Sequence, residues 1–215
     1  MVSRGLTFSA SYTLSKAVDD ASDPGATVSE TNLPQDVRNM AAERAEASFD
    51  HRHRVVGNFS YELPSAWIGT GWRVSGVVNA QSGAPFTVNL GTDRANVGSG
   101  PAQRPDVICD PNKGAPKTAA QWFNVDCFAL PAAFTFGNSG RNTVTGPGFS
   151  SVDTTIQKDL DLGNNRRLEF RWEIYNLLNT VNFDIPNRIA FTPNFGRIFS
   201  AQPARQMQFG VKYLF

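Results

Sequence analysis

The sequence predicts an all-β fold, an antiparallel transmembrane β-barrel segment of about six long strands in which short periplasmic turns alternate with long extracellular loops. Three observations predict this fold class. Apolar and polar residues alternate in six segments, the links between the segments are alternately short and long, and the last segment ends the chain on an aromatic residue, Phe215. Most of the segments span about 9 to 11 residues, the length that a tilted strand needs to cross a bilayer.

The first three predicted strands cover residues 6–14, about 54–63 and 72–81. In the first, apolar residues alternate with serine and threonine, so one face is apolar and the other is lined with hydroxyl groups. In the second and third, valine, glycine and aromatic residues oppose arginine, asparagine, serine and glutamate or glutamine. All three strands are therefore predicted to separate an apolar surface from a polar one.

The other three predicted strands cover residues 151–160, 168–174 and the C-terminal segment 208–215. Their apolar positions carry aliphatic and aromatic residues, and their polar positions carry mainly acidic residues, arginine, glutamine and threonine. Lys158 is an exception, because it falls on the apolar side near one end of its strand. We predict the same two-faced construction as in the first three strands.

The links between the strands carry an independent signal. Two of them, 64–71 and 161–165, are short and rich in turn residues. The other three, about 16–52, 86–150 and 179–204, are long. Long and short links thus alternate strictly, as they do when one membrane face carries brief turns and the other carries large loops. In a compact soluble domain, irregular links of this size would count against the strand assignment.

The C-terminal strand carries a spacing of its own. Gln208, Gly210, Tyr213 and Phe215 fit the order polar, any, Gly, any, any, aromatic, any, aromatic. This order resembles the pattern that the assembly machinery of the bacterial outer membrane reads in the final strand of barrel proteins. Such a strand has to pair with the first strand of its barrel, because pairing abolishes the open edge. The alternative interpretation is an ordinary amphipathic edge strand.

The composition excludes two classes of protein. Hydrophobic residues make up 40% of the chain, but no apolar run approaches the roughly 20 residues of a spanning helix, so a helical membrane protein is excluded. Twenty basic and nineteen acidic residues give a formal net charge of +1, which leaves no electrostatic footprint for nucleic acid. Residues 1–5 lack the features of a secretory signal peptide. If the barrel interpretation holds, we expect the chain to be the C-terminal piece of a longer precursor.

Five segments, spread over nearly the whole chain, resemble the last strands of TonB-dependent outer-membrane receptors, most of all those of the Oar-like branch. The resemblance implies a barrel of about 22 strands that is filled by an N-terminal plug. Residues 1–215 would be the C-terminal part of such a barrel, with plug domain and signal peptide absent, so that TonB is reached only through the missing plug. The segments are FSASYTLSKAVDDASD, FDHRHRVVGNFSYELP, GWRVSGVVNAQSGAPFTV, LEFRWEIYNLLNTVNFDIPN and QFGVKYLF.

Longer side chains on the polar faces of the strands are candidates for the barrel lumen. In a complete receptor they would touch the plug or line the solute path, and the alternative for each is a solvated or ion-paired wall. The candidates are Arg54, Glu62, Arg73, Gln81, Asp153, Gln157, Glu169, Arg171 and Glu173.

Aromatic residues gather near the short-turn ends of the predicted strands. This placement is expected of an aromatic belt at the periplasmic interface of the membrane. Packing into a soluble core is the alternative use of the same residues. They are Tyr61, Trp67, Trp72, Tyr213 and Phe215.

The longest loop contains both cysteines, Cys109 and Cys127. In an exported loop we expect them to form a disulfide, which would contribute roughly 3 kcal/mol by limiting the open states of the loop. Trp122, Phe123 and Phe128 belong to the same loop. These aromatic residues would pack onto the base of the loop or contact a ligand.

No active site, cofactor or metal is expected. His51 and His53 would share a strand face, but the arginines beside them repel a cation. The sequence contains neither the elbow motif of a serine nucleophile nor a phosphate-binding loop. We therefore expect a protein that is not an enzyme.

These observations favour a protein of the bacterial outer membrane. The first hypothesis is a transport barrel fragment, part of a TonB-dependent receptor that moves a large, unknown solute across that membrane. The alternatives are an autonomous small outer-membrane barrel that displays structural or adhesive loops, and a soluble β-sandwich that binds carbohydrate. The expected partners are outer-membrane lipid, the barrel assembly machinery and the remainder of the receptor, and not nucleic acid.

Overall fold

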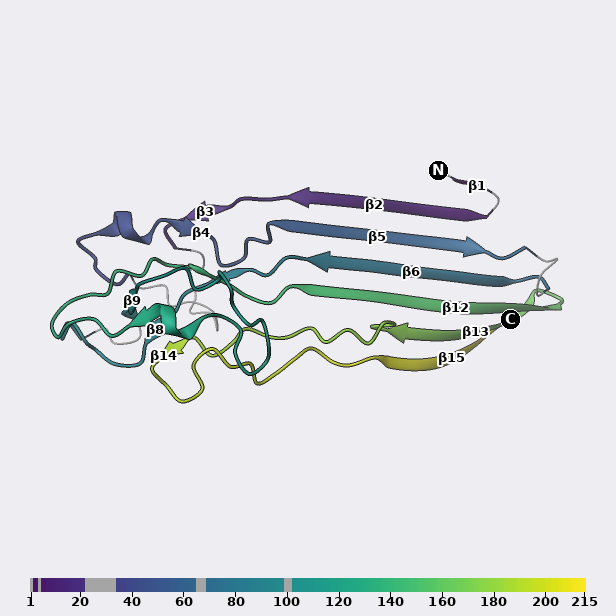
Figure 1. Cartoon of the computed structure of the whole chain (residues 1–215). Coiled ribbons are helices and arrows are strands. Elements are labelled where there is room, and N and C mark those ends of the chain that lie inside the picture. The colour runs from purple at the N-terminus through teal and green to yellow at the C-terminus, as the bar shows by residue number, and fades with distance from the viewer. Residues whose placement is uncertain (1, 4, 22–33, 65–68, 99–101) are drawn as a thin grey trace.

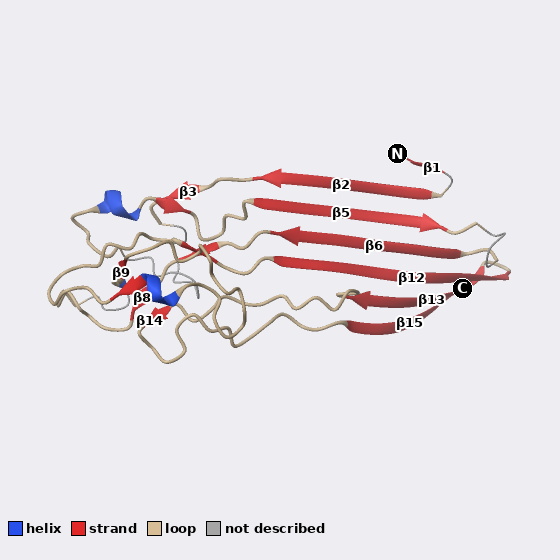
Figure 2. Ribbon diagram, viewed as in Figure 1, coloured by secondary structure: helices blue, strands red, loops and turns tan. Residues whose placement is uncertain are grey.

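The computed structural model describes residues 2–3, 5–21, 34–64, 69–98 and 102–215. Long strands lie side by side in one extended sheet, and the connections between them gather at its two ends (Figure 1, Figure 2). In Figure 1 the large loops fill the left end and the short turns lie at the right end. The fold is therefore a wall of strands with a body of loops at one end.

The main sheet has seven strands, and each neighbouring pair is antiparallel. The predicted number of about six differs because β1 has only two residues, too few for an alternating pattern to be visible in the sequence. The fourth predicted strand is longer than expected, with 15 residues in β12. In spatial order the strands are β1 (Val2–Ser3), β2 (Leu6–Leu14), β5 (His53–Glu62), β6 (Trp72–Gln81), β12 (Phe149–Gly163), β13 (Arg166–Tyr175) and β15 (Gln206–Leu214).

The main sheet is open. Strands β1 and β15 lie at its two edges and do not pair with each other, so the described residues form a barrel-like wall without closure. The other sheets within this part of the chain have two strands each. The β-sandwich alternative is not supported, because a sandwich requires a second large sheet packed on the first, and the described residues form one large sheet.

The strand register gives the main sheet one apolar and one polar face. Residues that pair across neighbouring strands point to the same side, so each row of partners can be followed across the sheet. The alternation predicted for the long strands is confirmed by two adjacent rows. The apolar row is Phe8, Phe59, Gly76, Thr154, Ile174 and Met207, and the polar row is Thr7, Ser60, Ser75, Thr155, Glu173 and Gln208.

The turn between β12 and β13 is tight. Only Asn164 and Asn165 connect these strands, and both adopt left-handed backbone angles, with φ of 52° and 60°. Two left-handed residues are what a type I′ hairpin turn requires, and asparagine tolerates this conformation better than most residues. The predicted turn at 161–165 is shorter in the structure because β12 continues to Gly163.

The long connections contain short regular elements. We call residues 15–52 loop 1, residues 82–148 loop 2 and residues 176–205 loop 3.

In the part of the chain that the structure describes, no helix has the length and hydropathy of a membrane span. The elements are helices η1 (Met40–Glu43) and η3 (Val125–Cys127), and the strand pairs β3 (Val18–Asp19) with β4 (Ala45–Glu46), β7 (Pro85–Phe86) with β11 (Val144–Thr145), β9 (Asp106–Val107) with β10 (Phe128–Ala129), and β8 (Asn89–Leu90) with β14 (Ile189–Ala190).

A buried apolar core joins loops 2 and 3. Ala190 of loop 3 is part of this core, and Phe195 of the same loop packs against it. The parallel pairing of β8 with β14 connects the same two loops. Loops 2 and 3 are therefore packed together as one body and are not two separate loops. The buried residues of the core are Phe86, Val88, Leu90, Phe123, Phe128, Val144 and Ala190.

Candidate functional site

The polar face of the main sheet is the candidate functional site, because it gathers charged and amide side chains from neighbouring strands. The register pairs Glu62 with Arg73 and Gln157 with Arg171, so these side chains project to the same side. All nine sequence-predicted lumen candidates lie on this face. They are Arg54, Glu62, Arg73, Gln81, Asp153, Gln157, Glu169, Arg171 and Glu173.

Charges of opposite sign alternate along this face. Arg73 Nη2 lies 2.9 Å from Glu62 Oε1, and both side chains are substantially exposed. Arg171 is ion-paired with Glu169, and Arg167 Nη2 lies 4.0 Å from the same carboxylate. The exposed pair of Arg73 with Glu62 contributes about 0–1 kcal/mol. The Glu169 side chain, by contrast, is 5% exposed and lies beside two arginines. The charges of this face are therefore largely balanced by neighbours of opposite sign.

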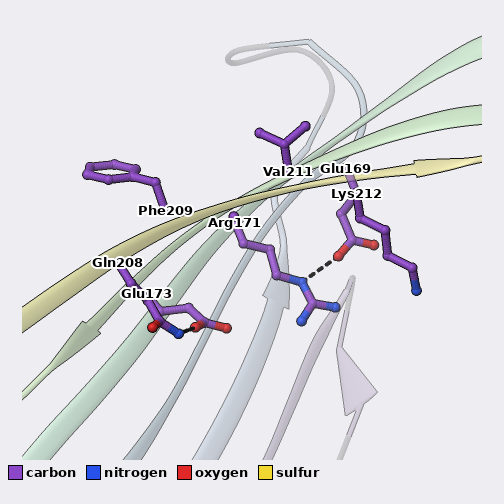
Figure 3. Close-up of a pocket in the computed structure, with 8 residues that line it drawn as sticks. Glu169, Arg171, Glu173, Gln208, Phe209, Val211 and Lys212 are labelled. Atoms are coloured by element: carbon purple, nitrogen blue, oxygen red, sulfur yellow. Dashed lines mark hydrogen bonds and ion pairs between the residues drawn. The ribbon is translucent and has the colours of Figure 1, made fainter.

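A hollow opens on this face between β13 and β15. Figure 3 shows Glu169, Arg171 and Lys212 reaching to one side of the β15 ribbon, while Phe209 and Val211 point to the other. The hollow measures about 360 Å³. Part of its space exists because the partner of Arg171 across the register is a glycine, residue 210, which has no side chain.

Two of the predicted candidates are held by their own neighbours. Asp153 Oδ1 accepts a hydrogen bond of 2.7 Å from the Ser151 hydroxyl and one of 2.8 Å from the backbone N–H of Asn176. This carboxylate caps the end of β13. Gln157 Nε2 donates to Asp159 at 3.0 Å. Both side chains are therefore hydrogen-bonded within the protein itself, and these bonds do not depend on a bound solute.

The two histidines do not converge on a metal. His51 precedes β5, and its Nδ1 lies 2.7 Å from the carbonyl oxygen of Ser82, with Gln81 Nε2 at 3.2 Å from its Nε2. His53 begins β5 and is hydrogen-bonded through Nδ1 to the Tyr12 hydroxyl at 2.8 Å. Among the described residues, no group of three or more metal-ligating side chains is present.

The four residues of the C-terminal spacing lie on or beside the outermost strand. Gln208 is hydrogen-bonded to the Glu173 carboxylate. A side chain at position 210 would have space, because no atom lies within 4 Å of the place where a Cβ on Gly210 would be. Tyr213 stacks on Phe215 with ring centroids 5.7 Å apart, and Phe215 is 95% exposed. The outer edge of β15 has no strand partner among the described residues.

The disulfide loop packs against loop 3. Cys109 and Cys127 form a disulfide. Phe123 is fully buried, and its ring lies 5.1 Å from that of Phe195 in loop 3. Trp122 donates its indole N–H to the Thr145 carbonyl at 2.9 Å. These aromatic residues therefore pack within the loop body, which is one of the two predicted uses. The packing also involves loop 3, which the sequence did not indicate.

Loop 1 is fastened to loop 2 by buried charges that the sequence analysis missed. Arg104 donates to both carboxylate oxygens of Glu43 at 2.7 and 2.8 Å, and each side chain is 3% exposed. The Gln35 side chain donates to the Gly137 carbonyl at 2.9 Å and accepts from the Arg104 backbone N–H at 2.7 Å. Arg141 donates to the Glu43 carbonyl at 2.9 Å. Loop 1 and loop 2 thus meet through a polar interface.

Two loop residues have displaced pKa values. Backbone N–H groups of Gly98 and Val97 donate to Asp93 at 2.6 and 3.0 Å, and these bonds hold the pKa of its carboxyl below the ordinary value of 3.8. Partial burial lowers the pKa of Lys117, against the opposing effect of the Asp110 carboxylate. The Lys117 ammonium lies 4.9 Å from the centre of the Trp122 ring.

Acid is expected to loosen the turn that Asp93 organises. Because the folded pKa is below the unfolded one, the bonds to the ionised carboxylate are fully present above pH ~4 and are lost as the pH falls through the lowered pKa. Hydrogen exchange at the Val97 and Gly98 amides, corrected for intrinsic rates, measures this opening. Asp93→Asn removes the titrating group and should abolish the pH dependence. A native profile as flat as that of the variant contradicts the prediction.

A one-layer antiparallel sheet that is polar on one side and apolar on the other, with short turns at one end and large loops at the other, is built like the wall of an outer-membrane β-barrel. The chain belongs to the outer membrane beta barrel domain family, whose model matches residues 1–208. Membership places the protein in the bacterial outer membrane. Comparison with curated proteins and with solved structures gives no match.

Proposed function

We propose that the chain forms part of the wall of an outer-membrane transport barrel that moves a large solute without changing it chemically. In this proposal residues 1–215 are the C-terminal barrel portion of a TonB-dependent receptor of the Oar-like branch. Support comes from the family match, from the resemblance of five sequence segments to such receptors, and from the two-faced sheet. TonB itself would act only through a plug outside these residues.

The observation that carries the proposal is the register of the long strands. It puts apolar rows on one face and polar rows on the other from β2 to β15. Strands β5 and β6 have ten residues each, which corresponds to about 33 Å of strand. At a tilt of about 40°, this length spans roughly the 25 Å apolar band of an outer-membrane barrel.

The apolar face has the features of a lipid-facing surface. Phe209 and Val211 are 78% and 65% exposed, although both are large and apolar. Lys158, which the sequence placed on this face, extends its ammonium to 5.1 Å from the centre of the Trp72 ring. A lysine that reaches toward an interfacial tryptophan near the short-turn end suits the periplasmic boundary of the bilayer. Trp67, another predicted member of the aromatic belt, lies outside the described residues.

The polar face would then line a wet lumen and contact the plug or the solute. Its paired charges give a surface along which a polar solute slides without meeting a strong field of one sign. The partners in this proposal are outer-membrane lipid, the barrel assembly machinery acting on the C-terminal strand, and the remainder of the receptor. No catalytic role, cofactor or nucleic acid enters the proposal.

An arginine on the apolar face is expected to destabilise the inserted protein far more than one on the polar face. Val78→Arg, next to Val77 in β6 and paired with Gly57 and Val152 on the apolar face, would place a charge in lipid, where the cost near the midplane is about 2–4 kcal/mol. Val77→Arg is the matched control, because Val77 is 47% exposed and its register partners are Asn58 and Asp153 on the polar face. Urea unfolding in bilayers measures both variants. Equal losses of stability would contradict the assignment of the two faces.

Solute uptake tests the transport proposal directly. Cells with and without the gene are compared for uptake of a labelled siderophore, oligosaccharide, peptide and cobalamin, each with and without a protonophore. The expected result is one solute whose energised uptake requires the protein. Uptake of all four classes that is unchanged by gene loss would contradict transport of these solutes.

An immunoblot of the outer-membrane fraction separates a receptor from a small barrel. The antibody is raised against the disulfide loop from Cys109 to Cys127. A band several times larger than the 23.5 kDa of the chain supports the receptor. A band at 23.5 kDa would instead favour an autonomous barrel that displays its loops.

A further inference from the structure

The apolar face of the main sheet continues beyond the strand ends onto loop 3. Tyr12, Val55, Ala80 and Ser150 form one row of register partners on this face. The side-chain amide of Asn182 then accepts from the Ser150 N–H at 2.8 Å and donates to the Ser150 carbonyl at 2.9 Å. Asn182 thereby binds the edge of β12 as a neighbouring strand would.

A hollow of about 450 Å³ lies on this extension. Val55 and Ala80 line it from the sheet, and Val181 lines it from loop 3. Val181 is 63% exposed, and Leu178, three residues before it, is 69% exposed. No aspartate, glutamate, lysine or arginine lines the hollow, which we call the notch. The exposed Val181 and Leu178 side chains, next to Val55 and Ala80, give a hydrocarbon chain an apolar surface to lie on.

Polar side chains also line the notch. They include those of His53, Gln81, Ser82, Thr180 and Asn182. His53 Nδ1 is hydrogen-bonded to the Tyr12 hydroxyl at 2.8 Å. With the phenol donating this bond, the ring proton lies on Nε2, which has no hydrogen-bond partner in the described part of the chain. The notch therefore offers one donor next to an apolar floor.

We propose that this notch binds an acyl lipid of the membrane leaflet nearest the loops. The acyl chain would lie against Val55, Ala80 and Val181, and an ester or phosphate oxygen of the lipid would accept a hydrogen bond from His53 Nε2. A lipid is the occupant because the notch continues the apolar face of a protein located in the outer membrane. The inference rests on the proposed function, in which that face meets lipid. Its consequence is that the first turn of loop 3 is anchored in the bilayer.

Spin labels at three valines test the inference. The native cysteines are joined in a disulfide, so a single new cysteine can be labelled in Val181→Cys, Val211→Cys and Val77→Cys. The full chain is inserted in vesicles of phosphatidylethanolamine and phosphatidylglycerol, and collisions of each label with oxygen and with a water-soluble nickel chelate are measured. Labels in hydrocarbon collide with oxygen, and labels in water collide with nickel.

The three labels give distinct outcomes. The inference expects position 181 to lose nickel accessibility and behave like position 211. If position 181 behaves like position 77 while position 211 remains in lipid, the inference is wrong and the proposed function stands. If position 211 is also accessible to nickel, the lipid-facing assignment of the proposed function fails.

Lipid retention tests the role of His53. Purified native protein and His53→Ala are compared for lipid phosphorus retained in detergent after reconstitution in the same vesicles. The variant is expected to lose retained lipid, and His53→Gln, which keeps an N–H donor, is expected to restore it. Equal retention by native protein and His53→Ala would overturn the proposed headgroup contact.

Discussion

Replacing Arg104 by methionine is expected to release loop 1 from loop 2, at a cost of about 3–5 kcal/mol. Arg104 binds both oxygens of the Glu43 carboxylate in a site where each side chain is 3% exposed. Removing the arginine leaves a carboxylate buried without its counter-charge, which is far more costly than the net value of the ion pair. Native-state hydrogen exchange of the amides in residues 34–46 measures the free energy of this opening.

The double variant Arg104→Met with Glu43→Leu is the control for this prediction. It removes both charges together, so no buried ion is left unpaired, and most of the lost stability should return. A double variant as unstable as the single one would show that the loss comes from packing rather than from the unpaired carboxylate. Exchange in β13 and β15 should be unchanged in both variants, because neither strand contributes to this interface.

The long strands could be predicted because their signal is local. Alternation with period two is visible within a single segment, and in a wall with one face in lipid each position must be apolar or polar according to its side. The nine lumen candidates share a face for the same reason. The additional length of β12 was not visible, because its first residues, such as Phe149, gain their strand conformation by pairing with Gln81 of β6.

The hydrogen bonds and ion pairs of the protein join residues that are far apart in the sequence, so the sequence of a single strand or loop does not show them. Asp153 was selected as a lumen residue, but it also caps the end of β13 through the N–H of Asn176. The ion pair of Arg104 joins residues 61 positions apart, in loops without periodicity. The described residues form an open sheet with β1 and β15 at its two edges, and alternation within a strand does not show whether its sheet closes.

The loop body was the hardest part to predict, since its core is assembled from single apolar residues scattered over two loops. Phe195 stands among proline, glycine and polar residues, whereas Phe86 and Phe123 each begin a short alternation of apolar and polar residues. These alternations are shorter than the predicted strands, and nothing in either segment shows which other segment it packs against. Loops 2 and 3 therefore meet through apolar side chains, whereas loop 1 meets loop 2 through polar ones.

Replacing Phe123 by alanine is expected to separate loops 2 and 3, at a cost of about 3–5 kcal/mol. The side chain is fully buried, and its ring lies 5.8 Å from Phe86, 5.9 Å from Phe128 and 5.1 Å from Phe195. The substitution removes apolar burial and leaves a cavity that the surrounding rings fill only partly. Hydrogen exchange at the Trp122 amide, which donates to the Gly196 carbonyl at 2.9 Å, reports the opening between the two loops.

Phe134→Ala is the matched control, because it makes the same chemical change on the surface of loop 2. Phe134 is 76% exposed, so its removal should alter stability by no more than about 0.5 kcal/mol. Equal effects of the two substitutions on the Trp122 amide would contradict a shared core. Since Arg104 and Phe123 lie in different junctions, their effects should add, and strong coupling between them would mean that the three loops open as one unit.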